Sequence, residues 1–322
     1  MRIAGLITLA FCAVATTAAT QSFQLDLPID CALGSTCYIQ NYVDSDPSKN
    51  ASDHTCNALT YDTHKGTDFA LTSRAQMESG VNVLAVAPGT IVGLRDGMAD
   101  TGLTAETATD IEGRECGNGV VIQHRDGWTS QYCHMKQGSI TVVKGARIDT
   151  GTILGKVGLS GRTEFPHVHL SLRHKNLLVD PFDPDGVITC GAPSPDTLWR
   201  SPLAYQPGGI ITAGFATQIP SYDAIKSGTA ATDQIAPDAP ALVLWGHMFG
   251  SRAGDTMRLD IAGPEGWTHS QTVTLEKPQA QLFRATGKRL TKPWPTGDYT
   301  GTVTLLRDGT EINRRQTNLT VQ

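Results

Sequence analysis

Short runs of apolar residues that alternate with polar ones recur through the middle of the chain, and each run ends near glycine, proline, asparagine or aspartate. Alternation with period two is typical of half-buried strands, and the bounding residues are typical of turns. Asp126–Gly127 separates two such runs and predicts a tight hairpin. The runs are TDFALT, VNVLAVAPGTIVGL, NGVVIQHRDGWTSQYCHM, SITVVKGARI, ILGKVGLSG and HVHLSLRHKNLLVDP. This pattern predicts an all-β domain over residues 61–210, built on an antiparallel β-sheet.

The pattern resumes at residue 239 and continues to the end of the chain. The further runs are ALVLWGHMF, MRLDIAGP, HSQTVTL, AQLFRATG, GDYTGTVTLLRDG and TEINRRQTNLTV. Six short strands in a segment of this size predict a small immunoglobulin-like β-sandwich over residues 239–322. Residues 211–238 are small and polar with two prolines, which predicts a linker that holds one short helix around SYDAIKSG.

The N-terminus has a composition of its own. Residues 1–19 have a cationic start, an apolar middle and small residues at the end, which is the order of a signal peptide. We expect cleavage after Ala19, with Ala15 as the alternative, and an exported protein that is periplasmic or secreted. No other segment is long and apolar enough to predict a transmembrane span. Residues 20–60 are polar and rich in turns and cysteine, and we expect a lead-in that lies outside the core.

Six cysteines remain after removal of the signal peptide, and an even number in an exported chain predicts three disulfides. The absence of any C-x-x-C pair disfavours a cysteine zinc cluster. Cys116 and Cys133 flank the predicted hairpin and are the first pair that we expect; Cys31 with Cys37 is the second. The six are Cys31, Cys37, Cys56, Cys116, Cys133 and Cys190. Because all precede residue 191, the cross-links belong to one part of the chain, which supports two domains.

The charge balance excludes one class of partner. The chain has 26 lysines and arginines against 31 acidic residues, a net charge of −5. Because no basic footprint is present, we expect no nucleic-acid binding.

Four histidines and one aspartate stand in patterns that suggest metal chemistry. His64 and Asp68 lie four residues apart at the start of a predicted strand, and His134 ends the hairpin. His167 and His169 emerge on the same face of a strand because the side-chain period is two. Three nitrogen or oxygen ligands with an open position are typical of catalytic zinc. The residues supply His64, Asp68 and one member of the His167/His169 pair as ligands, and leave two histidines for acid–base work.

The three motifs occur in a fixed order, as His64-Lys-Gly-Thr-Asp68, Tyr132-Cys-His134 and His167-Val-His169. With the segment VLAVAPGTIV between the first two motifs and LLVDP after the last, residues 60 to 184 resemble the lysostaphin-type (LytM-like) zinc metalloendopeptidases of peptidoglycan. The resemblance implies a duplicated hybrid motif fold. It also makes residues 61–210 a zinc metallopeptidase domain.

The resemblance implies roles for the five residues. His64, Asp68 and His169 would bind Zn²⁺, and His134 and His167 would be catalytic, one deprotonating the attacking water and the other stabilising the oxyanion. The implied function is hydrolysis of peptide bonds in peptidoglycan stems or cross-links by a zinc-activated water.

Two other functions stay open: a non-catalytic regulatory or wall-binding module of the same fold, and an exported zinc peptidase with a protein substrate. The C-terminal domain could bind wall polymer through its tryptophans, or a partner protein. We expect a monomer.

Three further residues have two interpretations. Tyr61 and Tyr132 could contact substrate or could pack in the interior, and Asn118 could line the substrate groove. The long acidic segment 97–115 could overhang that groove or could be a solvated insertion.

Overall fold

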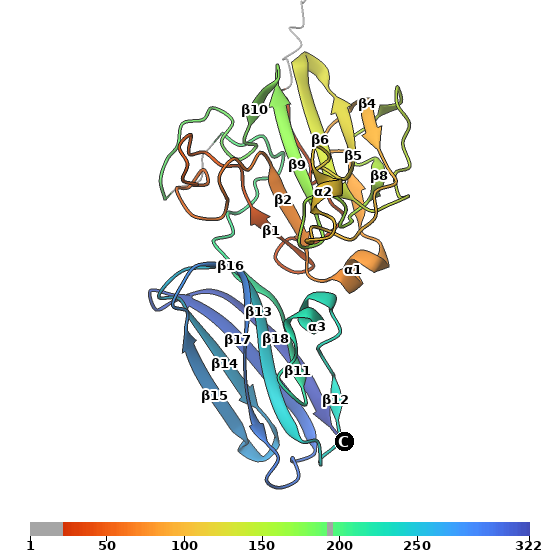
Figure 1. Ribbon diagram of the computed structural model, residues 1–322. Coiled ribbons are helices and arrows are strands. Elements are labelled where there is room, and N and C mark those ends of the chain that lie inside the picture. Colours follow the sequence, from red (N-terminus) through yellow and green to blue (C-terminus); the bar gives the residue numbers. More distant parts are fainter. Residues whose placement is uncertain (1–21, 192–195) are drawn as a thin grey trace, which may run out of the picture.

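The computed structural model of the protein describes residues 22–191 and 196–322. The described chain is mainly β and forms two parts that lie end to end, each with its own hydrophobic core (Figure 1). The expected all-β fold class is therefore confirmed. The predicted signal peptide lies outside the described residues. Among the residues that are described, no helix is both long enough and apolar enough to cross a membrane.

The N-terminal part is built on one antiparallel sheet whose order places sequence-distant strands side by side. Strand β9 (His167–His174) lies between β2 (Thr67–Leu71) and β6 (Trp128–Met135), which are far from each other in the sequence. In spatial order the strands are β1 (Cys37–Asn41), β2 (Thr67–Leu71), β9 (His167–His174), β6 (Trp128–Met135), β5 (Asn118–Gln123), β4 (Gly89–Arg95) and β7 (Arg147–Ile148), with β10 (Leu177–Val179) paired to β9. A second sheet pairs β3 (Asn82–Leu84) with β8 (Ile153–Lys156), and the helices α1 (Arg74–Ser79) and α2 (Ala108–Ile111) are short.

The predicted hairpin joins β5 to β6. Asp126 and Gly127 lie at its turn with φ of 56° and 83°. These left-handed conformations suit the Asp–Gly pair, because glycine has no Cβ and aspartate tolerates this region better than most residues.

The expectation for the lead-in was wrong. Residues 20–60 contribute an edge strand, β1, and the side chains of Leu25, Ile39 and Tyr42 are fully buried in the N-terminal core. Isolated apolar residues between turns show no period along the sequence. They become core only when the chain folds back onto later strands.

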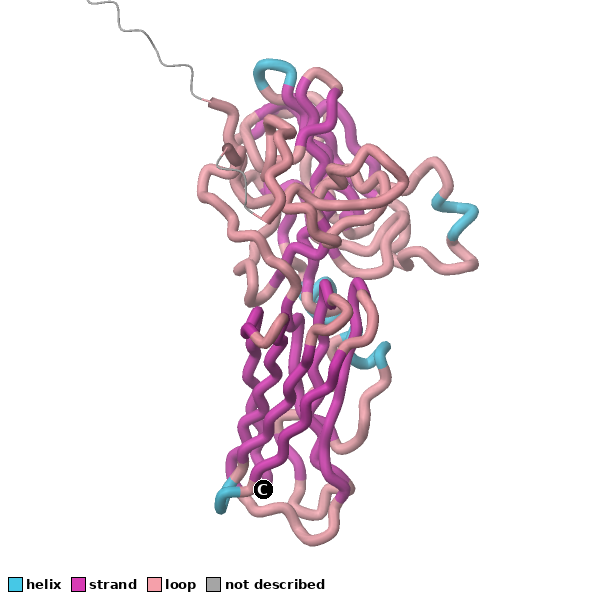
Figure 2. The backbone as a smooth tube through the Cα atoms, turned by 90° about the vertical axis from the view of Figure 1, so that its left-hand side faces the viewer, coloured by secondary structure: helices cyan, strands magenta, loops and turns pink. Residues whose placement is uncertain are grey.

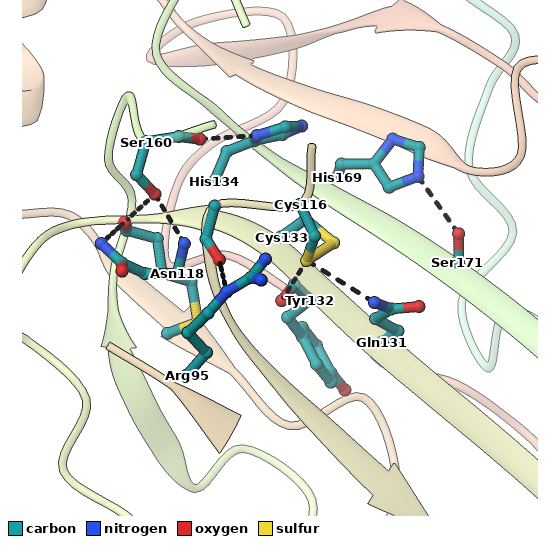
Figure 3. The surroundings of a disulfide bond; sticks show 12 residues. Arg95, Cys116, Asn118, Gln131, Tyr132, Cys133, His134, Ser160, His169 and Ser171 are labelled. Carbon is teal, nitrogen blue, oxygen red and sulfur yellow. Dashed lines mark hydrogen bonds between the residues drawn. A yellow bond between two sulfur atoms is a disulfide. The ribbon is translucent and has the colours of Figure 1, made fainter. Parts of the chain in front are cut away.

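Both predicted disulfides form, Cys116–Cys133 and Cys31–Cys37, and the third joins Cys56 to Cys190. Cys133 immediately precedes His134 on β6, so this bridge ties the loop before β5 to the strand that carries a candidate catalytic residue (Figure 3).

The C-terminal part is a β-sandwich of two sheets packed over one core (Figure 2). One sheet contains β11 (Gly209–Ala216), β13 (Ala241–Ser251) and β16 (Gln279–Arg289). The other contains β12 (Gln234–Ile235), β18 (Thr310–Val321), β17 (Gly297–Arg307), β14 (Thr256–Ala262) and β15 (Thr268–Thr274). All six strands predicted after residue 239 are present. Trp245 and Trp294 are buried, so they offer no exposed platform for a sugar.

The segment 211–238, expected to be a linker, instead forms part of the sandwich. β11 pairs with β13, β12 pairs with β18, and the predicted short helix is α3 (Tyr222–Ser227) between them. Glycine and alanine make up half of β11, so its apolar pattern is weak in the sequence. The packing of Ile210, Ile211 and Phe215 is what holds it.

Candidate metal centre and catalytic cleft

The strand register brings three of the predicted residues to one face of the sheet. Asp68 on β2 lies opposite His169 on β9, and Ala70 lies opposite His167. Residues opposite each other in an antiparallel pair share a face, and His167 and His169 share it because they are two apart. Nδ1 of His169 lies 2.8 Å from Oδ1 of Asp68, and Nε2 of His167 lies 3.3 Å from the same oxygen.

His64 reaches the same point from the turn that precedes β2. Its Nε2 lies 3.2 Å from Oδ2 of Asp68 and 3.2 Å from Nδ1 of His169. One candidate ligand atom from each of His64, Asp68 and His169 lies within 4.8 Å of the others. The three residues predicted to bind metal therefore form one compact, largely buried cluster.

The outer nitrogen of each ligand imidazole faces a group that fixes its tautomer. Nδ1 of His64 lies 2.7 Å from the carbonyl oxygen of Tyr42, which can only accept a hydrogen bond. Nε2 of His169 lies 3.1 Å from Oγ of Ser171, whose hydroxyl donates to the carbonyl of Lys65. Each outer nitrogen thus carries the hydrogen, and the nitrogen at the cluster presents its lone pair, as metal-binding histidines do.

Electrostatics favours the charge state that a metal requires at Asp68 and His169, whereas at His64 the adjacent Asp68 outweighs burial and raises the pKa. Burial raises the pKa of Asp68, but the surrounding His64, His167 and His169 outweigh it and hold that pKa well below its ordinary value. Burial lowers the pKa of His169, which keeps this imidazole neutral. An ionised carboxylate with imidazole nitrogens is a donor set that zinc prefers, so the residues fit the ion that the sequence predicts.

His134 lies beside this cluster because its backbone departs from the strand. Its φ of 62° is in the left-handed region, which is uncommon outside glycine and is concentrated at functional sites. Its amide donates to the carbonyl of Cys116, and its Nδ1 lies 2.8 Å from the carbonyl oxygen of Ser160 (Figure 3). Burial, followed by the nearby histidines, lowers the pKa of His134 well below its usual value.

His167 lies next to His134, with ring centroids 4.6 Å apart. Its Nδ1 lies 2.9 Å from the carbonyl oxygen of Phe165 and 3.1 Å from Oγ1 of Thr163. Nδ1 of both His134 and His167 therefore donates to a backbone carbonyl, which leaves Nε2 of each ring as the nitrogen that can exchange a proton. All five residues predicted from the sequence are brought together.

The comparison with known proteins agrees with this geometry. The family model that matches the chain is described as peptidase family M23, and it covers residues 62–181. This segment is an M23 peptidase domain.

Two curated proteins match about a third of this chain. Over 120 residues the chain is 28% identical to the cell division protein DipM of Caulobacter vibrioides, a match that covers 36% of this chain and 18% of DipM. Over 109 residues it is 31% identical to the peptidoglycan DD-endopeptidase ShyA of Vibrio cholerae, covering 34% of this chain and 20% of ShyA. The chain thus spans about a fifth of the length of these curated relatives.

Solved structures similar to the chain include two M23 catalytic domains. That of the prophage-encoded M23 protein EnpA from Enterococcus faecalis is 24% identical, with a TM-score of 0.33, and the match covers 53% of this chain and 98% of that one. That of lysostaphin from Staphylococcus simulans is 22% identical, with a TM-score of 0.29, covering 44% and 85%.

The M23 domain also uses a residue that the sequence did not reveal. Asn41 on β1 lies opposite Asp68, and its Nδ2 donates to Oδ2 of Asp68 over 3.0 Å. The pairing of β1 with β2 is non-local, and no motif marks it. Ser171, by contrast, could have been found, because it follows His169 by two residues on the same face of β9.

A cavity of about 490 Å³ opens onto Asp68, His134 and His167. Tyr61 and Leu103 also line it, so the 97–115 segment does reach the cleft. The other two ambiguous residues do not line the cavity. Tyr132 is fully buried and its hydroxyl accepts from the amide of Val86; the amide of Asn118 donates to the carbonyls of Met98 and Met135.

Proposed function

We propose that this protein is an exported zinc metalloendopeptidase that hydrolyses peptide bonds in peptidoglycan stems or cross-links. One observation carries the proposal. Nε2 of His64, the carboxylate of Asp68 and Nδ1 of His169 converge beside the paired imidazoles of His134 and His167, in an M23 domain and at a cleft large enough for a peptide.

His64, Asp68 and His169 would hold the Zn²⁺ ion. When bound, it would supply a Lewis acid that activates water and polarises the scissile carbonyl. A set of three protein ligands would suit catalytic rather than structural zinc, which has four protein ligands. The Tyr42 carbonyl and the Ser171 hydroxyl orient the two ligand imidazoles.

His134 and His167 share the proton work. One imidazole accepts a proton from the attacking water through its Nε2, and the other, in its protonated form, donates a hydrogen bond from Nε2 to the oxyanion of the tetrahedral intermediate. The proton then passes to the leaving amine. The carbonyls of Ser160 and Phe165 fix both rings through Nδ1, so neither ring must reorient during the reaction.

The substrate and the location follow from the relatives and from the cysteines. ShyA is named for a peptidoglycan DD-endopeptidase activity, and DipM for a role in cell division. Three disulfides are expected only outside the reducing cytosol. Peptidoglycan also lies outside the cytosol. The complete and convergent set of five residues favours an enzyme over a non-catalytic module of the same fold.

The direct test is digestion of purified sacculi by the purified protein, beside a glycine-rich protein as the alternative substrate. We expect soluble muropeptides with new amino termini, detected by mass spectrometry, which disappear with a chelator and return with Zn²⁺. His174→Ala is the matched control, because His174 lies on β9 but stacks on Trp128 away from the cluster. If only the glycine-rich protein is cleaved, the substrate is a protein and not peptidoglycan. If neither substrate is cleaved, the proposal is overturned.

A further inference from the structure

The catalytic cleft has a wall that does not belong to the M23 domain. The end of β13 with its following turn, residues 250–252, and the start of β16, residues 278–280, line the same cavity as Asp68, His134 and His167. Both segments come from the C-terminal sandwich (Figure 1). A substrate that reaches the catalytic histidines would therefore also contact the sandwich.

Hydrogen bonds fix this wall to strand β1. Nε2 of Gln281 donates to the hydroxyl of Tyr38 over 3.0 Å and to Oε1 of Gln40 over 2.9 Å. Nε2 of Gln40 donates in return to the carbonyl of Ala280 over 3.2 Å, and the ring of Phe249 packs on Tyr38 with centroids 4.5 Å apart. Strand β1 pairs with β2, which carries Asp68. The contacts with β1 therefore fix the position of the wall relative to Asp68.

A buried ion pair holds the turn itself. Arg307 on β17 pairs with Asp255 at 2.8 Å and also donates to the carbonyls of Gly250 and Pro207. The carboxylate of Asp255 accepts from the amide of Arg252. The backbone that presents Arg252 to the cleft is therefore tied down at both of its ends.

Two arginines line the cleft, one from each part of the molecule. Arg252 comes from the sandwich and Arg162 from the loop before β9. Within the described residues, neither guanidinium forms an ion pair with a carboxylate; Arg252 donates to the neutral Oδ1 of Asn57 at 2.7 Å. The exposed carboxylate that lines the same cavity, Glu164, also faces the neighbouring pocket beside Lys226.

We propose that the sandwich wall is part of the substrate site and that Arg252 and Arg162 bind free carboxylates of the peptide substrate. The guanidinium group binds carboxylates through paired hydrogen bonds. The remaining lining, which includes Leu59, Leu103 and Ala280, suits small apolar side chains. The substrate class is thus an acidic peptide with small apolar residues. This inference rests on the proposed function, because it places the peptide at the same catalytic residues.

The test compares a stem peptide that has free carboxylates with the same peptide in which all carboxylates are amides. Binding is measured by calorimetry on the His134→Ala variant, so the result does not depend on turnover. We expect the amidated peptide to bind about 10- to 100-fold more weakly, the range for charged hydrogen bonds. Arg252→Gln and Arg162→Gln should each reduce this difference, and Arg→Lys at either position should restore part of it.

Three controls separate charge from structure. Asn57→Ala removes the contact of Arg252 but keeps its charge, so discrimination should persist. Arg258→Gln changes an exposed arginine of β14 that pairs with Asp260, and should have no effect. Ala280→Trp, at the start of β16, should block binding of both peptides, whereas Ala262→Trp, at the end of β14, should not.

Equal binding of the two peptides, or unchanged discrimination in both arginine variants, would overturn the inference. Preferential binding of the acidic peptide by a protein that cleaves no peptidoglycan would instead contradict the proposed function and leave the carboxylate site standing.

Discussion

The two parts of this molecule are both β-rich, but they are stabilised in different ways. In the N-terminal part the strands of the main sheet have at most 8 residues, loops are long, and three disulfides cross-link the chain. In the sandwich β13, β16, β17 and β18 have 11 or 12 residues, and the part has no cysteine.

Buried polar side chains show the same division. Most of them lie in the N-terminal part, including four of the five residues of the proposed centre (His64, Asp68, His134 and His167), while the sandwich interior is mainly apolar. Buried polar groups require partners that are held in place, and this requirement accounts for the disulfides and backbone contacts around the histidines. The N-terminal part thus has short strands and long loops, which hold the polar side chains of the proposed centre in place. The sandwich has long, regular strands and forms a wall of the cleft.

The largest effect should come from the charge at the centre of the N-terminal part. Asp68→Asn removes the negative charge that His64, His167 and His169 surround, so we expect kcat/KM for sacculus digestion to fall at least about 1,000-fold, roughly 4 kcal/mol. Asp260→Asn, on the sandwich surface, should leave the rate unchanged. Comparable rates in the two variants would remove the functional distinction between the two parts.

Loss of the longest cross-link should destabilise only the N-terminal part. Cys56 and Cys190 are 134 residues apart, against 6 for Cys31 and Cys37. The chain-entropy estimate gives roughly 5 kcal/mol for the first bridge and roughly 2 kcal/mol for the second. We expect denaturant unfolding of the two double alanine variants to follow this order, and hydrogen exchange to show protection lost in the N-terminal strands and kept in β13–β18. Equal loss in both parts would show that they unfold as one unit.

The sandwich should be most sensitive at its buried ion pair. Arg307→Met leaves the carboxylate of Asp255 buried without its cation, which costs about 3–5 kcal/mol in comparable cases. Arg258→Met, at an exposed pair with Asp260, should cost less than about 1 kcal/mol. Urea unfolding measures both. A small effect of Arg307→Met would mean that the wall of the cleft is held by other contacts.

The smallest predicted effect is a pH dependence that belongs to the N-terminal part. Burial raises the pKa of Asp180 to about 7, from its model-compound value of 3.8. Between these two values the folded protein retains a proton that the unfolded chain has released, so this group stabilises the fold at low pH and the stability is lost as the pH rises through 7.

Asp180→Asn should remove that dependence. The amide can keep the bond that Oδ1 accepts from Phe182, so we expect the variant to gain on the order of 2 kcal/mol over wild type between pH 5 and pH 8. Thermal unfolding across this range provides the measurement. A constant difference between the two proteins would show that Asp180 does not titrate there.

Local patterns predicted much of the N-terminal sheet and the residues of the centre. The Asp–Gly turn, the pairing of Cys116 with Cys133 and the shared face of His167 and His169 all depend on neighbours within about 20 residues. The six sandwich strands after residue 239 were predicted for the same reason.

The features that were not predicted depend on contacts between distant segments. Asn41 meets Asp68 because β1 pairs with β2, and the sandwich reaches the cleft through non-local contacts such as that of Gln281 with Tyr38. Strand β11 was read as linker because glycine and alanine weaken its alternation. In each of these cases, tertiary packing decides the structure and no local motif signals it.

The assignment of ligand and catalytic residues is best tested by measuring zinc content together with sacculus cleavage in His169→Ala and His134→Ala. We predict that His169→Ala loses both zinc and cleavage, because a ligand is gone. His134→Ala should retain one zinc per chain and lose cleavage by about 100- to 10,000-fold, the usual contribution of general acid–base catalysis. Full zinc in His169→Ala, or wild-type cleavage by His134→Ala, would contradict it.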